Sequence, residues 1–142
     1  MRTKEFIKEY KTDNVLADKL IGRKIIEWNK DYLKLDDNTI ITIEMTEYEY
    51  PASAGGEFKD IELEAVITDV RFAEPEEVIY DNFYRETEAR REVVFVHNLN
   101  SIGKANMYAD NGEADYYYSV CAFKIGDIYY APLGSWGEIL EC

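Results

Sequence analysis

The spacing of apolar residues predicts helix at the start of the chain. Residues 3–21 carry apolar side chains at helical intervals, with Thr12, Asp13 and Asn14 interrupting the pattern. Short polar residues at such a break favour a helix N-cap, and glycine favours the position after a helix end. We therefore expect two short helices, the second capped by Asp13 or Asn14 and closed by Gly22.

Beyond Gly22 the apolar period shortens to two. Residues 24–28, 32–35 and 39–45 are rich in strand formers and are separated by polar turn residues. In the third segment, Ile41 and Ile43 lie on one face and alternate with polar side chains on the other. Three such runs in succession predict an antiparallel meander.

The middle of the chain has a less uniform pattern. Residues 46–57 contain a proline and several small residues, and predict a loop. Residues 58–72 alternate, but the parity changes near 65–66, so a strand with a bulge and a short helix at 58–66 both fit. Residues 76–91 are highly charged, and we expect an exposed helix or loop there.

Strand signals return after residue 91. Residues 92–97 predict a strand. Asn111-Gly112 tolerates positive φ at both positions, so it predicts a type I′ hairpin turn between 104–109 and 115–123. Because the helical and strand patterns are segregated, we expect an α+β fold, with short N-terminal helices followed by a mainly antiparallel β-sheet.

Charge is the feature of the composition that changes this picture. The 142 residues include 29 acidic and 16 basic side chains, for a formal net charge of -13, and 46% are hydrophobic. The length and apolar content predict one domain over residues 1–142. The charge argues against nucleic acid as a direct ligand, because that binding requires Lys and Arg to neutralise phosphates. The acidic surface either keeps the protein soluble or imitates nucleic acid toward a basic partner.

The cysteines and the apolar runs indicate a compartment. Cys121 lies in an apolar run and Cys142 is the last residue, so neither suggests a disulfide framework. The first residues lack the apolar stretch of a signal peptide, and no run reaches the roughly 20 apolar residues of a membrane helix. The expectation is a reducing cytoplasm, without membrane association.

The sequence offers little organised chemistry. His97 is the one histidine and no Cys-x-x-Cys is present, so no metal site and no cofactor are predicted. The 29 acidic residues leave an oxygen-only Mg²⁺ or Ca²⁺ site as an alternative, although the EF-hand spacing is absent. Cys121 and His97 could be drawn together from neighbouring strands, but an apolar setting makes a thiol inert. The Gly-x-Ser-x-Gly and phosphate-loop motifs are absent. We therefore predict a binding protein and no enzyme.

Aromatic and basic residues supply the candidate contacts. Twelve residues are tyrosine, which suits both strands and the stacking of ligand rings. Arg85, Arg90 and Arg91 gather beside Phe83 and Tyr84. Guanidinium groups can clamp phosphates. The alternative is that these arginines pair with neighbouring glutamates on a solvated surface.

Acidic residues also cluster around the 46–57 loop. If Asp60, Glu62 and Glu64 lie on one strand, their carboxylates share a face at about 7 Å spacing. This spacing is close to that of successive phosphates along a single nucleic-acid strand, and it equally suits an ordinary solvated sheet face. If a partner binds these acidic side chains, charge reversal at Glu47, Glu62 and Glu64 would weaken its binding.

Two stretches resemble a family of small phage-encoded domains. The resemblance is carried by Thr42–Glu47, Ala52–Phe58 and Val66–Val70, and later by Asn111-Gly112 with Tyr116–Val120. That family usually has a cysteine pair in the loop, where this chain reads Tyr50-Pro51-Ala52-Ser53. The resemblance implies a phage counter-defence protein, similar to anti-Thoeris nucleotide sponges or to anti-CRISPR proteins.

Two functions follow from the resemblance. The first is a non-catalytic sponge that sequesters a small nucleotide signal, of the cyclic nucleotide or cyclic ADP-ribose type, and forms a homo-oligomer. Its expected ligand-binding residues are Phe83, Arg85, Arg90, Arg91, Asn98, Tyr108 and Tyr117. The alternative is an acidic nucleic-acid mimic that binds a basic groove of a host defence nuclease.

Overall fold

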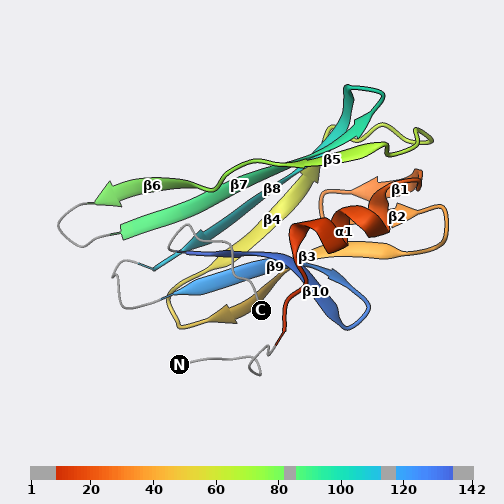
Figure 1. Cartoon of the computed structure of the whole chain (residues 1–142). Coiled ribbons are helices and arrows are strands. Elements are labelled where there is room, and N and C mark those ends of the chain that lie inside the picture. The colour runs from red at the N-terminus through yellow and green to blue at the C-terminus, as the bar shows by residue number, and fades with distance from the viewer. Residues whose placement is uncertain (1–8, 82–85, 113–117, 136–142) are drawn as a thin grey trace.

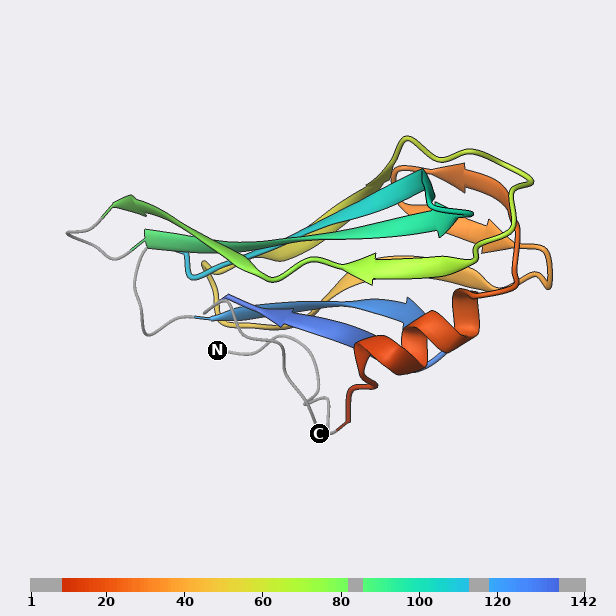
Figure 2. The same cartoon turned by 45° about the horizontal axis from the view of Figure 1, so that its top comes forward.

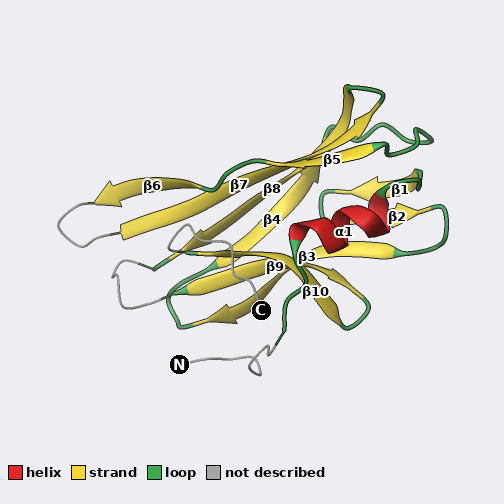
Figure 3. Ribbon diagram, viewed as in Figure 1, coloured by secondary structure: helices red, strands yellow, loops and turns green. Residues whose placement is uncertain are grey.

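The computed structural model describes residues 9–81, 86–112 and 118–135, and strands dominate this part of the chain (Figure 3). The described residues contain one helix and ten strands. In chain order they are α1 (Asp13–Leu20), β1 (Ile25–Asn29), β2 (Tyr32–Leu35), β3 (Ile40–Tyr48), β4 (Ala54–Lys59), β5 (Asp69–Phe72), β6 (Glu76–Asp81), β7 (Glu86–His97), β8 (Asn100–Asp110), β9 (Ser119–Ile125) and β10 (Ile128–Gly134).

The strands form two antiparallel sheets that lie face to face (Figures 1 and 2). The first sheet has the order β1-β2-β3-β9-β10. The second has the order β4-β8-β7-β5, and β6 follows β5 along the same edge of β7. The predicted predominance of antiparallel strands is confirmed, with a sandwich of two sheets in place of one.

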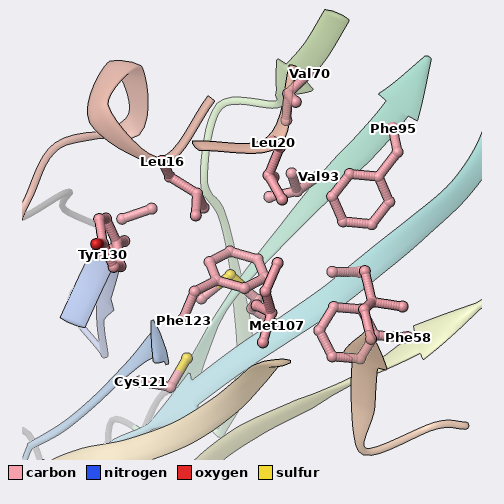
Figure 4. Close-up of a cluster of buried hydrophobic side chains, with 14 of the residues drawn as sticks. Leu16, Leu20, Phe58, Val70, Val93, Phe95, Met107, Cys121, Phe123 and Tyr130 are labelled. Atoms are coloured by element: carbon pink, nitrogen blue, oxygen red, sulfur yellow. The ribbon is translucent and has the colours of Figure 1, made fainter. Parts of the chain in front are cut away.

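The core fills the space between the sheets (Figure 4). The ring centroid of Phe58 on β4 lies 6.5 Å from that of Phe95 on β7 and 6.3 Å from that of Phe123 on β9. Helix α1 contacts β10 and β5, so it closes the open edge of the sandwich with the buried side chains of Leu16 and Leu20. Both sheets therefore bury one face against each other and leave the other face outward.

The prediction of several N-terminal helices is corrected to one helix within the described residues. The positive φ of Gly22 just beyond its end agrees with the expected end of the helix. The cap predicted at Asp13 or Asn14 is wrong, because the N-cap is Thr12, which makes no side-chain capping bond, and the Asp13 carboxylate accepts from Arg91 instead. Residues 9–12 are not helical. The backbone of Lys11 instead bonds both Tyr129 and Ala131, because the free edge of β10 offers it strand-like partners.

The meander is confirmed, since β1, β2 and β3 pair in sequence. The hairpin predicted at Asn111-Gly112 is wrong, because β8 belongs to the second sheet and β9 to the first. Gly112 does adopt positive φ, at 75°. It serves a crossing between layers, where an added Cβ would come within 2.8 Å of the Ala52 nitrogen.

Two further expectations fail in the second sheet. Residues 76–91 were expected as helix or loop, yet β6 and the first half of β7 are strands. Asp60, Glu62 and Glu64 do not share a strand, because β4 ends at Lys59 and both Asp60 and Glu64 have positive φ. The regular 7 Å row of carboxylates is therefore not formed there.

Candidate binding cleft

Alternation along β7 sends Arg90 and Arg91 to opposite faces of the second sheet. Ala89 and Val93, which share a face with Arg91, are fully buried against the first sheet, whereas Arg90 is exposed. Two adjacent arginines that the sequence groups together are thus separated by the sheet. We call the face that carries Arg90 the outer face of the second sheet.

Arg91 is committed to the fold. Its Nη1 and Nη2 atoms donate to the Asp13 carboxylate at 3.1 and 2.7 Å, and its Nε donates to the Ala73 carbonyl at 2.8 Å. The guanidinium carbon also lies 5.2 Å from the ring centroid of Phe72. Only 4% of the residue is exposed. This side chain ties the start of α1 to the sheet edge and does not reach an outside ligand.

Arg90 lies within a row of side chains that crosses the outer face. The strand register places it opposite Tyr108 on β8 and opposite Glu76 on β6. Its Nε donates to the carboxylate of Glu88, two residues earlier on the same strand. The alternative reading of the sequence, that these arginines pair with neighbouring glutamates, holds for this pair.

A cleft of about 720 Å³ opens on this outer face. Strands β4, β8 and β7 form it, together with the β5–β6 connection and the start of β6. Its lining contains five glutamates, Glu57, Glu74, Glu76, Glu88 and Glu92, against Arg90 and Arg91. Because the Arg91 side chain points to the opposite face, the charge presented to the cleft is strongly negative.

Tyr108 forms part of the cleft lining, with 37% of its surface exposed. Its ring lies over Gly55 of β4, where an added Cβ would be 3.4 Å from the Tyr108 hydroxyl oxygen and 3.5 Å from Cε1. The absence of a side chain on Gly55 therefore leaves room for the ring to lie across the neighbouring strand. The cleft combines an aromatic surface with carboxylates.

Basic side chains on the same face gather toward the far end of the sheet. A cross-strand row there runs from Lys59 through Lys104 and Val94 to Arg71. The Lys104 Nζ atom lies 3.7 Å from the Glu92 Oε2 atom, at the boundary between the two zones. The outer face is thus divided into an acidic cleft and a basic end.

The other predicted contact residues are not brought to the described cleft. Asn98 has positive φ at the turn between β7 and β8, eight residues from Arg90 and hence roughly 26 Å away at the strand rise. Phe83, Arg85 and Tyr117 lie outside the described residues. Of the seven predicted residues, the structure brings together Arg90 and Tyr108 on one face.

Sequence reasoning missed the glutamates that line the cleft. Glu57 lies on β4, whereas Glu88 and Glu92 lie on β7, and these residues meet only through the register of β4, β8 and β7. A detectable signal was the alternation of the charged residues Glu88, Arg90 and Glu92 with a second set that includes the apolar Ala89 and Val93. That alternation is the pattern of a strand with one solvated face.

The Cys–His pair considered from the sequence does not form. Cys121 is buried on β9 of the first sheet, and burial raises the pKa of its thiol to about 12. His97 ends β7 in the second sheet, where Nδ1 lies 2.7 Å from the Val66 carbonyl and Nε2 lies 3.1 Å from the Asn98 Nδ2 atom. Within the described ranges, no group of three or more His, Cys, Asp or Glu residues is placed to hold a metal ion.

A second cluster of tyrosine and glutamate lies on the outer face of the first sheet. Tyr10 packs on Val120 there, and its hydroxyl donates to Glu47 Oε2 at 2.6 Å. The Tyr118 hydroxyl donates to Glu47 Oε1 at 3.3 Å. Burial, and next the hydrogen bond to Glu47, raise the pKa of Tyr10 well above its ordinary value. Glu47 is only 6% exposed, so the sequence-based expectation that it faces a partner is corrected.

These features define an antiparallel β-sandwich protein with a buried Tyr10–Glu47 cluster on one outer face and an acidic cleft on the other. The chain belongs to the family described as Domain of unknown function (DUF7448), whose model matches residues 18–124. The match begins within α1 and ends within β9, so it includes the cleft. No curated protein and no solved structure matches the chain. The helix in the described ranges lacks the length and apolarity needed to cross a membrane.

Proposed function

We propose that this protein is a non-catalytic binding protein whose acidic cleft binds a basic segment of a partner protein. The observation that carries the proposal is the lining of the cleft, in which five glutamates accompany one outward-facing arginine. This function belongs to the same class as the acidic inhibitor expected from the sequence. It differs in presenting a concave surface rather than a row of phosphate-like charges.

Electrostatics favour a cationic partner over a phosphate-bearing one. A cleft lined by one sign of charge concentrates the field and attracts the opposite charge. Arg90, the arginine that faces the cleft, already donates to Glu88. Tyr108 adds the face of an aromatic ring, which attracts ammonium and guanidinium groups. Lysine and arginine side chains therefore match both components of the lining.

The proposal is tested by calorimetric titration with the acetylated and amidated peptide Lys-Val-Lys-Val-Lys-Val-Lys, referred to below as the basic peptide. We expect binding that weakens with added salt, because the contacts are between exposed charges. Replacing both Glu57 and Glu92 by Gln is expected to raise Kd about tenfold. Both residues are exposed, so the variant keeps its fold.

The matched control is the double variant Glu62→Gln, Glu64→Gln. It changes net charge by the same amount, but its two exposed residues lie in the segment between β4 and β5, away from the cleft lining. Its Kd should equal that of the wild type. Equal weakening by both double variants would attribute binding to overall charge, and no binding by the wild type would refute the proposal.

Sequestration of a small nucleotide, with a phage counter-defence role, is the second candidate. One observation favours it: Tyr108 and Arg90 are opposite one another in the cleft, as a base-stacking ring and a phosphate-binding group would be. Native mass spectrometry with a pool of cyclic nucleotides and ADP-ribose derivatives would support this function if the protein retained an intact nucleotide. The same spectra would report the predicted homo-oligomer.

A further inference from the structure

Strand β6 is an edge strand beside the cleft. It pairs with β7 on one side, from Glu76 opposite Arg90 to Asp81 opposite Glu86. Within the described ranges no strand pairs with its other side. In both Figure 1 and Figure 2, the end of β6 and the start of β7 extend beyond the strands of the first sheet. An edge of this kind presents backbone donors and acceptors to another chain.

The side chains of β6 set the kind of chain that fits. Ile79 is 55% exposed in the middle of the strand, whereas Glu76 and Glu77 form its acidic start. Opposite charges directly across a strand pair stabilise it. The edge therefore accepts a strand with basic residues around an apolar centre.

The position of Glu76 links this edge to the cleft. Glu76 lines the cleft and belongs to the cross-strand row that continues through Arg90 to Tyr108. A strand added to β6 would extend that row by one position. The Cβ atoms of directly opposed residues in neighbouring strands are about 5 Å apart, so a lysine opposite Glu76 would pair with it at the rim of the cleft.

We infer that the basic segment of the partner binds in an extended conformation, as an additional antiparallel strand on β6. Main-chain hydrogen bonds to the edge supply affinity, and alternate basic side chains reach Glu76 and the cleft on the outer face. The inference rests on the proposed function and adds the mode of binding. It names the partner as a strand-forming segment with alternating basic and apolar residues.

Hydrogen exchange with the full chain tests the inference. The basic peptide is added at about ten times its Kd, and amide exchange is followed by mass spectrometry. Exchange at the outward-pointing amides of residues 76–81 is expected to slow roughly tenfold, because exchange there requires release of the peptide. The amides of β1, at the edge of the other sheet, should be unchanged.

Two controls separate the mode of binding from the charge. The acidic peptide Glu-Val-Glu-Val-Glu-Val-Glu should give no protection. Glu76→Lys should reduce the protection of residues 76–81 and weaken binding, whereas Glu62→Lys, with the same change in charge, should do neither. Binding of the basic peptide without protection of β6 would overturn strand addition and leave the proposed function intact. Absence of binding would overturn both.

Discussion

The two outer faces of the sandwich contain the same residue types in different states. On the first sheet, Tyr10 and Tyr118 donate hydrogen bonds to Glu47, and the chain itself buries the cluster. On the second sheet, Tyr108, Glu57 and Glu92 remain exposed at the cleft. Tyrosine and carboxylate content alone therefore does not identify a binding surface.

The difference arises from what covers each face. Residues 9–12 run along β10 and bring Tyr10 over the first sheet. The Glu47 carboxylate is therefore hydrogen-bonded within the protein. A buried carboxylate must be hydrogen-bonded, whereas an exposed one is solvated until a partner displaces water. The buried Tyr10–Glu47 cluster contributes to stability, and the exposed cleft of the second sheet is available for binding. Matched variants on the two faces should separate these roles.

Reversal of charge at Glu47 and at Glu57 should give the largest difference in the free energy of unfolding between the two faces. Glu47→Lys would remove the acceptor for Tyr10 and Tyr118 and bury an ammonium group, at a cost of about 4 kcal/mol in the free energy of unfolding. Glu57→Lys, on the exposed cleft, should change that free energy by less than about 0.5 kcal/mol. Urea unfolding measures both. A similar loss for the two variants would erase the distinction between the faces.

The adjacent arginines provide the next test. Arg91→Ala removes the bidentate ion pair with Asp13 and the hydrogen bond to the Ala73 carbonyl, and should lower the free energy of unfolding by about 3 kcal/mol. Arg90→Ala removes an exposed pair with Glu88 and should cost less than about 1 kcal/mol. The order of the two thermal midpoints checks this prediction, and a lower midpoint for Arg90→Ala would contradict it.

Removal of single hydroxyl groups compares the tyrosines directly. Tyr10→Phe loses a hydrogen bond to the buried carboxylate of Glu47, which should cost about 2 kcal/mol. Tyr108→Phe keeps the ring over Gly55 and should leave stability nearly unchanged. Both values come from denaturant unfolding at neutral pH. A larger loss of stability in Tyr108→Phe than in Tyr10→Phe would contradict the assignment of Tyr10 to a buried cluster and of Tyr108 to an exposed cleft.

The pH dependence of stability sharpens the comparison at the smallest scale. Because the pKa of Tyr10 is raised in the folded protein, the folded state retains this proton after the unfolded state has lost it. The associated stability is complete below the ordinary pKa of 10.0 and is lost as pH rises above it. Tyr10→Phe should therefore show a shallower alkaline fall in unfolding free energy than the wild type. Equal slopes would contradict this role.

The sequence predicts the parts of the fold in which one face is apolar. Strand β2 alternates buried and half-buried residues, and β3 places Ile41, Ile43 and Met45 against the core at every second position, so the hydrophobic period reveals both strands. The charged strands were missed for the opposite reason. β6 extends beyond the first sheet, and the first half of β7 has its glutamates and Arg90 on the open face, so neither strand shows a strong apolar period.

The candidate site was predictable only in fragments. Arg90 and Tyr108 were expected as contacts, and the strand register brings them opposite one another. Arg91 was expected beside them, yet the alternation of a strand turns it toward Asp13. Glu57 is distant in sequence from both, so no local pattern could place it in the cleft. Tertiary register, rather than composition, assembles the acidic surface.

Mapping the bound peptide onto the two faces tests the central claim most directly. Backbone amide chemical shifts of the labelled protein would be followed by NMR during titration with the basic peptide. The account predicts that the largest shifts fall on the edge strand β6 and on β4, β7 and β8 around Glu57, Glu92 and Tyr108, with the outer face of the first sheet unaffected. Shifts centred on β9 and β10, or no shifts at all, would contradict it.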